Sequence, residues 1–158
     1  MKRHESLVPL SRDHRSGLIL AQLIKKDGKS HKGKPSTLSG KVEYATRFYR
    51  EQLIPHFTLE EEVLFPAVRG TDEIVDRHIT NLLDEHREIS ALVATLERKT
   101  DREGKLDTLG RLLEAHIREE EQHLFERIQE VISEDKLQEL RDAIVSHAAT
   151  ISQTRTLP

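Results

Sequence analysis

The sequence contains no cysteine. Disulfide bonds, iron–sulfur clusters, zinc fingers with thiolate ligands and cysteine nucleophiles are therefore excluded. The chain does have 9 histidines, together with 28 aspartate and glutamate residues. Any metal ion that it binds must be held by imidazole and carboxylate groups.

Glycine and proline are scarce, with only 7 Gly and 5 Pro among 158 residues. Hydrophobic residues make up 35% of the chain and charged residues 34%. This composition favours helices with heavily charged outer faces over a disordered chain. The length suits one ordinary domain with a core of its own. We therefore predict a single domain over residues 1–158.

The chain also lacks long apolar runs and a strong excess of charge. No run approaches the roughly 18 residues of a membrane span, and the N-terminal apolar run is broken by Pro9 and ends in R-D-H-R. We read no export signal and expect a cytoplasmic protein without a membrane partner. The net charge of −3 is evenly mixed, so we expect no nucleic-acid partner. The basic segment 25–34 is interpreted as a solvated loop.

Apolar periodicity and the positions of Gly, Pro and Ser divide the chain into helical stretches. We expect helices over about 11–26, 36–65, 72–99, 106–132 and 134–152, and no strand. Pro55 is predicted to kink the second helix, and Gly17 to let a neighbouring helix approach the first. Short loops make neighbouring helices antiparallel. The fold prediction is an all-α, up-down-up-down four-helix bundle over about 8–132, with an additional C-terminal helix.

Polar residues interrupt the apolar seams of these helices. The third seam consists of Val75, Ile79, Leu82, His86, Ile89, Val93 and Leu96, and the fourth of Leu109, Leu113, His116, Glu120, Leu124, Ile128 and Val131. His14 lies on the apolar face of the first helix, and His56 and Glu60 lie on that of the second. Each of the first four helices thus carries histidine at a position that points into the core.

The chain repeats itself. The segment H-F-T-L-E-E-E-V-L-F, which begins at His56, recurs 60 residues later as H-I-R-E-E-E-Q-H-L-F, which begins at His116. Upstream of each copy an acidic residue precedes His-Arg, as D-H-R at residues 13–15 and E-H-R at residues 85–87. The pattern indicates two helical hairpins of one design, each with a histidine on its first helix and His-x-x-x-Glu on its second.

The spacing of the repeated residues indicates metal binding. Four residues along a helix correspond to about 400° of rotation and about 6 Å of rise, so the His and Glu of His-x-x-x-Glu point the same way. Two such helices and two further histidines supply four imidazoles and two carboxylates, a set suited to iron or manganese and less specifically to zinc. A carboxylate from each hairpin can bridge two ions. The predicted ligands are His14, His56, Glu60, His86, His116 and Glu120.

A metal-free polar network that fixes helix register is the alternative explanation. It would bury His beside Glu twice in one core, at a cost of several kcal/mol for each poorly paired group. A bound cation removes that cost, which favours the metal site.

The remaining polar residues near the seams receive other interpretations. His123, seven residues after His116, is expected to line the pocket beside the ligands, with direct ligation as the alternative. His78 is expected at the surface or a helix interface, and Tyr49 in the ordinary core or else in the pocket. The residues expected at the exposed surface are His4, His31, His147, Glu61, Glu62, Glu119 and Glu121.

The order of the motifs resembles a known family. A His, then His-x-x-x-Glu, a second His and a second His-x-x-x-Glu, with L-F-P at residues 64–66, is similar to the hemerythrin-like, or HHE cation-binding, domain over about residues 8–132. The resemblance implies a four-helix bundle with a non-haem di-iron centre, bridged by the two carboxylates, that binds oxygen, nitric oxide or related molecules. Oxygen-carrying hemerythrins have an extra His one turn before His86, where this chain has Leu82. The four-His, two-Glu centre of bacterial HHE proteins is therefore expected, and not a reversible oxygen carrier.

Three functions are compatible with these observations. The first is a di-iron protein that binds or reacts with oxygen, peroxide or nitric oxide as sensor, scavenger or iron donor. The second is a structural or storage bundle that holds zinc or manganese and acts through a protein partner. The third is an interaction protein whose surface and last helix bind a partner. The sequence has no G-x-S-x-G and no phosphate-binding loop, so no enzyme class is indicated.

Overall fold

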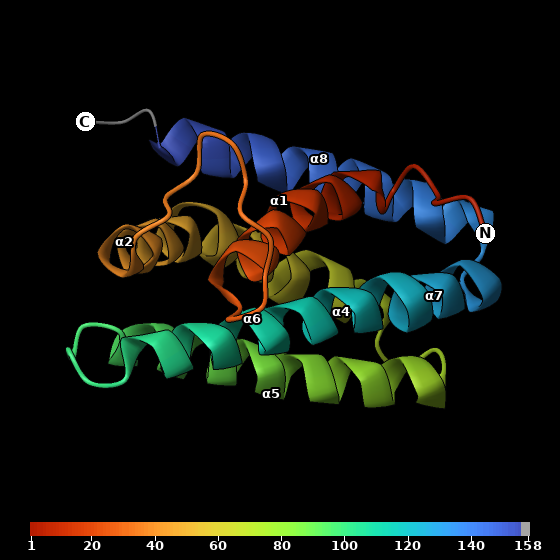
Figure 1. Ribbon diagram of the computed structural model, residues 1–158. Helices are drawn as coiled ribbons and strands as arrows, with labels where there is room; N and C mark the ends of the chain where they lie inside the picture. Colours follow the sequence, from red (N-terminus) through yellow and green to blue (C-terminus); the bar gives the residue numbers. More distant parts are fainter. Residues whose placement is uncertain (156–158) are drawn as a thin grey trace.

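The computed structural model describes residues 1–155, with side chains as far as residue 150, and residues 156–158 of the predicted domain lie outside the described part. The described chain is helical and contains no strand. It forms a four-helix bundle with an extra C-terminal helix, as predicted (Figure 1). The elements are α1 (Val8–Ile24), α2 (Leu38–Phe48), η1 (Tyr49–Leu53), α3 (Ile54–Leu59), η2 (Glu60–Leu64), α4 (Phe65–Val68), α5 (Glu73–Thr95), α6 (Arg102–Glu119), η3 (Glu120–Leu124), α7 (Phe125–Val131) and α8 (Glu134–Arg155).

The second and fourth long helices are not regular α-helices, because π-helical turns divide them. The turns η2 and η3 begin at Glu60 and Glu120, and each ends with an i→i−5 bond, from Phe65 N–H to Glu60 O and from Phe125 N–H to Glu120 O. A π turn adds one residue to the helix and often marks a functional site. Pro55 follows the third such turn, η1, in the first turn of α3, where a missing N–H is tolerated. At the position of the predicted kink, the structure therefore has a π-helical turn.

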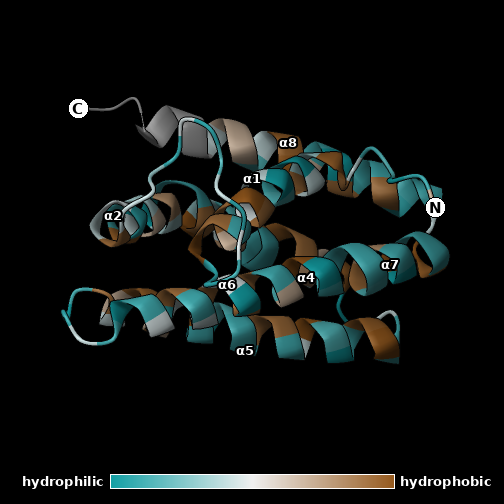
Figure 2. Cartoon of the chain, viewed as in Figure 1, coloured by the Kyte–Doolittle hydropathy of each residue, from teal (hydrophilic) through white to brown (hydrophobic). Residues whose placement is uncertain are grey.

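A polar layer separates two apolar parts of the core. One apolar cluster includes Leu10, Ile79 and Phe125, and the other includes Leu20, Ile89 and Leu113. All six side chains are at most 2% exposed. Hydrophobic and hydrophilic residues alternate around the helices (Figure 2), as expected for amphipathic helices that pack around one core. The polar layer is thus supported by apolar packing above and below.

Two glycines allow α1 and α6 to pack closely. A Cβ atom added to Gly17 would lie 2.7 Å from Ile117 Cδ1, and one added to Gly110 would lie 2.9 Å from the backbone oxygen of Ala21. Both distances are too short for real contacts, so a Cβ at Gly17 would displace the end of the Ile117 side chain, and one at Gly110 would push the backbone of α1 away. The predicted role of Gly17 is confirmed.

The C-terminal helix α8 lies along one side of the bundle (Figure 1). It packs against η2 and α3. Leu137, Leu140 and Ile144 bury its inner face. Over residues 1–155, no helix has the length and apolar character needed to cross a membrane.

Two of the three histidines predicted to be exposed have polar partners and are partly buried. The ring of His4 contacts Ser6 at 2.8 Å and Glu134 at 3.2 Å, and its side chain is 16% exposed. His147 lies 2.9 Å from Glu62 and is 22% exposed. The prediction was wrong for both, because docking of α8 places these residues in helix interfaces. His31 is exposed, as predicted.

Asp72 caps α5 and joins its first turn to α7. Its carboxylate accepts hydrogen bonds from Ile74 N–H at 3.0 Å and Val75 N–H at 3.1 Å. It also forms an ion pair with Arg127 at 2.7 Å. The hydrogen bond from Arg127 and the backbone bonds outweigh desolvation and lower the pKa of Asp72 to about 2.

Replacement of Asp72 by alanine is expected to lower the melting temperature by about 2–4 °C at neutral pH, because the helix cap and the ion pair are both lost. A lowered pKa means that folding favours the ionised group. The stabilisation is therefore complete above the ordinary carboxyl pKa of about 3.9 and disappears as the pH falls through about 2. Thermal melts of both proteins between these pH values measure the difference. The exposed Asp142→Ala serves as control, and a difference that persists undiminished at low pH would contradict the prediction.

Candidate metal centre

The structure brings the six predicted ligands together in the polar layer. They come from α1, α3, α5 and α6 and from the first residues of η2 and η3. All are buried, with exposures of 4% for His14, 5% for His56, 0% for Glu60, 5% for His86, 1% for His116 and 0% for Glu120. The predicted ligands of both hairpins therefore lie in one buried cluster.

Glu60 lies between histidines of both hairpins. Its Oε1 is 2.9 Å from His56 Nε2, and its Oε2 is 3.1 Å from His86 Nε2. Each oxygen of this one carboxylate thus faces a different imidazole.

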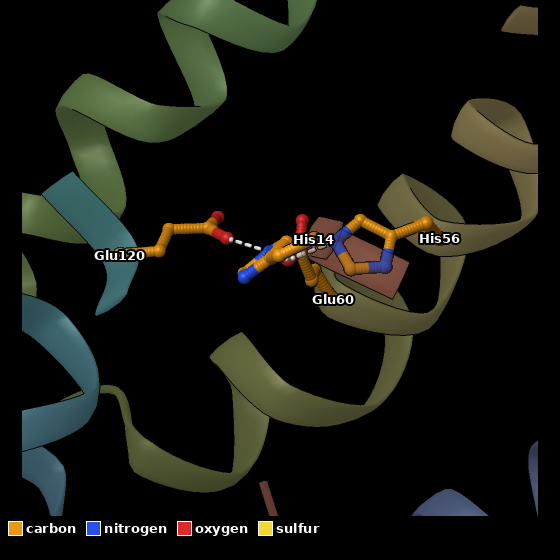
Figure 3. Close-up of side chains that lie close together, drawn as sticks. All are labelled: His14, His56, Glu60 and Glu120. Atoms are coloured by element: carbon orange, nitrogen blue, oxygen red, sulfur yellow. Dashed lines mark hydrogen bonds and ion pairs between the residues drawn. The ribbon is translucent and has the colours of Figure 1, made fainter. Parts of the chain in front are cut away.

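Glu120 repeats the arrangement from the opposite side. Its Oε2 is 2.8 Å from His14 Nε2 and its Oε1 is 3.4 Å from His116 Nε2. Figure 3 shows the His14 ring between Glu120 on one side and His56 with Glu60 on the other. The ligand atoms form two overlapping sets in which all atoms lie within 4.8 Å of one another: His14, His56, Glu60 and Glu120, and Glu60, His86, His116 and Glu120. The two carboxylates belong to both sets.

Several buried polar atoms of this cluster lack hydrogen bonds. Among the side chains that the structure describes, both carboxylate oxygens of Glu60 and Glu120 have no hydrogen-bond partner, nor does Nε2 of His86 or His116. Unpaired polar atoms are rare and costly in protein interiors. Cations placed between the two sets would supply the missing partners. The donor set of imidazoles and carboxylates therefore fits a pair of metal ions.

Outer carboxylates hold three of the four imidazole rings by their Nδ1 atoms. Such bonds fix the tautomer that presents Nε2 to a metal and raise the basicity of the ring. The pairs are His14 with Glu121 at 2.6 Å, His56 with Asp13 at 2.9 Å, and His116 with Glu85 at 2.7 Å.

The sequence interpretation missed these three outer carboxylates. Asp13 and Glu85 are the acidic residues that precede His-Arg in the two upstream motifs, so the repeat itself contained the signal. Glu121 was predicted at the exposed surface, which was wrong. It is 26% exposed and accepts hydrogen bonds from His14, from Ser11 at 2.6 Å and from Arg3 at 2.8 Å. These contacts with Arg3 and with α1 hold Glu121 against the bundle. Glu61 and Glu62 are exposed, as predicted, whereas Glu119 is partly buried beside His78.

The electrostatics of the cluster favour positive charge at its centre. Burial alone lowers the pKa of His14, but the neighbouring carboxylates of Glu120 and Glu121 outweigh it and raise the pKa to about 9. Burial raises the pKa of Glu60, but the neighbouring His56 and His86 hold it well below the usual range. The buried carboxylates thus favour protonated, positively charged histidines at this site, and they would favour metal cations for the same reason. Metal ions that bind there would replace those protons.

His123 does not line the centre, contrary to the prediction. Its side chain is 58% exposed and stacks on His78 with ring centroids 6.0 Å apart. The π turn η3 shifts the register by one residue, or about 100° of helical rotation. Leu124 therefore takes the inward position and is completely buried. His78 lies at the interface of two helices, as predicted.

The change His123→Ala is expected to leave metal content unchanged, because the side chain points away from the centre. Metal analysis by mass spectrometry after purification gives the result, and His116→Ala, which removes a central imidazole, provides the comparison. A loss of metal from His123→Ala that equals the loss from His116→Ala would show that His123 takes part in binding.

A small enclosed cavity adjoins the histidines. Its volume of about 10 Å³ leaves room for roughly one water-sized molecule. Three histidines, Asp13 and Gln52 supply its polar lining, and the apolar lining consists of Gly17, Phe48, Leu53, Phe57, Leu113 and Ile117. A ligand that enters this space must be very small. Tyr49 does not line this cavity and is partly buried beside a separate surface groove.

Comparison with known proteins agrees with the arrangement of the site. The model of the hemerythrin HHE cation binding domain matches residues 9–128. Comparison with curated proteins and with solved structures found no significant match. The match covers most of the chain and contains all six residues of the buried cluster. The chain therefore belongs to the hemerythrin HHE cation-binding domain family.

Proposed function

We propose that the protein binds two iron ions through His14, His56, Glu60, His86, His116 and Glu120, and that it binds or reacts with a small oxidant there. The observation that carries the proposal is the pair of completely buried carboxylates shared by two sets of ligand atoms. A single ion would not use both sets. Manganese or zinc are the alternative metals.

The donor set supports iron or manganese over zinc. Imidazole and carboxylate ligands suit iron and manganese, whereas zinc favours closed four-coordinate sites. In the proposed assignment each ion would be held by two imidazoles and by the two carboxylates, and such a set would leave room for a further small ligand. When bound, a pair of iron ions supplies the electrons for reactions with oxygen, peroxide or nitric oxide.

The protein's own residues would orient the ligands and restrict access. Asp13, Glu85 and Glu121 hold three rings with Nε2 turned inward. The apolar walls of the small cavity limit entry to molecules of a few atoms. These features support a role as sensor, scavenger or iron donor. The proposed location is the cytoplasm, and the proposal includes no membrane or nucleic-acid partner.

Metal analysis combined with spectroscopy tests the proposal. The protein is purified aerobically, its metals are measured by mass spectrometry, and its visible spectrum is recorded before and after dithionite. We expect about two irons per chain and an absorption band that dithionite removes. Titration of the reduced protein with nitric oxide and oxygen then identifies the ligand.

The same experiment decides between the proposed function and a structural metal site. Zinc in the purified protein, with no absorption band after anaerobic loading with iron, would support a bundle that uses metal for stability and acts through a partner. His123→Ala is the matched control for these measurements, because it removes a histidine outside the cluster.

A further inference from the structure

One of the four central imidazoles is held differently from the others. The Nδ1 atoms of His14, His56 and His116 donate to carboxylates at 2.6–2.9 Å. The Nδ1 atom of His86 is buried but has no hydrogen-bond partner among the described side chains. The carboxylate that it faces, Glu61, is 3.8 Å away, which is beyond hydrogen-bond distance.

The hairpin repeat explains this exception. Glu61 follows Glu60 as Glu121 follows Glu120, so the two occupy equivalent places. Glu121 is held against His14 by Ser11 and Arg3. Ser11 and Arg3 lie 3 and 11 residues before His14. The residues at the same distances before His86 are Leu83 and Val75, which have no polar side chain. Glu61 consequently stays at the surface, with 45% of its side chain exposed, compared with 26% for Glu121.

The packing around His86 is also more open. A surface groove of about 460 Å³ reaches its ring, between α5 and the helix that contains η1 and α3. Tyr49, Thr58 and Glu61 line one side of the groove, and the short side chains of Ser90, Ala91 and Ala94 line the other. Across the bundle, Gly17 and Gly110 close the corresponding interface.

Apart from Glu60 at Nε2, stacking positions the His86 ring. The ring of Phe57 lies parallel to it, with centroids 3.8 Å apart and an angle of 16° between the planes. Stacking fixes the plane of an imidazole but does not select its tautomer or raise its basicity. Outer hydrogen bonds do both, and loss of one costs about 10–100-fold in metal affinity.

We propose that the two ions are held unequally: the ion bound by His86, His116, Glu60 and Glu120 is exchangeable, and it enters and leaves through the groove beside Glu61. This inference rests on the proposed function, since it requires two bound ions. The ion at His14 and His56 is then the tightly held one, which dissociates slowly. The exchangeable ion is the one that the protein can donate or take up.

Release of iron to a chelator tests the inequality. Protein that has been shown to contain two ferrous ions per chain is mixed with excess ferrozine, and release is followed by absorbance. We expect two phases of equal size, with the first about 10–100-fold faster. Crystals of half-depleted protein, measured at the iron absorption edge, should retain the ion beside His14 and His56. A single phase, or a retained ion beside His86, would overturn the inference.

Three variants separate the effect of the outer carboxylates from the effect of the groove. Asp13→Asn should accelerate only the slow phase, because Asp13 holds His56 and not the exchangeable side. Ala91→Phe, at an exposed position that lines the groove, should slow only the fast phase. Glu62→Ala is the matched control, since Glu62 is an exposed acid of the same π turn that does not line the groove. Acceleration of both phases by Asp13→Asn would contradict the assignment of the tightly held ion.

The starting material distinguishes the two proposals. A chain that cannot be loaded with two ions contradicts the proposed function, and the inequality falls with it. A chain that loads two ions and releases them at one rate contradicts the inequality alone.

Discussion

Replacement of Glu120 by alanine is expected to remove both metal ions. Its two oxygens face His14 and His116, which belong to different sets of ligands. Loss of an outer partner already costs about 10–100-fold in affinity, so loss of a shared ligand should cost more than about 100-fold for each ion. Glu60→Ala should have the same effect, because Glu60 occupies the equivalent place.

A variant that lacks one histidine ligand provides the comparison for Glu120→Ala. His14→Ala removes a ligand of one set only and should leave the ion at the other set in place. Metal content by mass spectrometry and calorimetric titration of the metal-free variants provide the measurements, with His123→Ala as control. If Glu120→Ala retains two ions, the carboxylate is not shared and the proposed assignment is wrong.

Removal of the metal is expected to lower the melting temperature by about 10 °C or more. An ion present at 1,000 times its dissociation constant stabilises a protein by about 4 kcal/mol, and two ions contribute about twice that amount. Each kcal/mol corresponds to about 2–4 °C for a chain of this length. Without the ions, the unpaired oxygens of Glu60 and Glu120 remain buried.

The metal-free protein should nevertheless remain helical, because apolar clusters pack on both sides of the polar layer. Circular dichroism of the loaded and chelated protein measures helix content and melting temperature together. Addition of metal to Glu120→Ala should restore little stability. Equal melting temperatures with and without metal in the unmodified chain would argue against a structural contribution of the ions.

The sequence predicts the bundle and the convergence of the six residues because both depend on regular helical periodicity. His86 and His116 continue apolar seams, and a His-x-x-x-Glu motif points to one side of any helix. Because the motif recurs after 60 residues, the sequence predicts that the His-x-x-x-Glu faces of two helices point toward each other in the core.

The π turns were not predictable by the same reasoning. An extra residue in a helical turn leaves the apolar pattern nearly intact over a few residues, so no simple periodicity reveals it. Its effect appears just after Glu120, where His123 turns to the surface. The contacts of Asp13 and Glu85 cross between helices, and they depend on the rotation of each helix in the packed bundle. Local sequence does not determine that rotation.

The sharing of Glu60 and Glu120 has a consequence for biosynthesis. On the proposed assignment, the first hairpin contains three of the four ligands of its own ion, and the fourth is Glu120. A nascent chain on the ribosome therefore exposes an incomplete site until the second hairpin has been translated and docked. Iron capture must follow translation of both hairpins, so a bound ion indicates that the second hairpin has been made and has docked on the first.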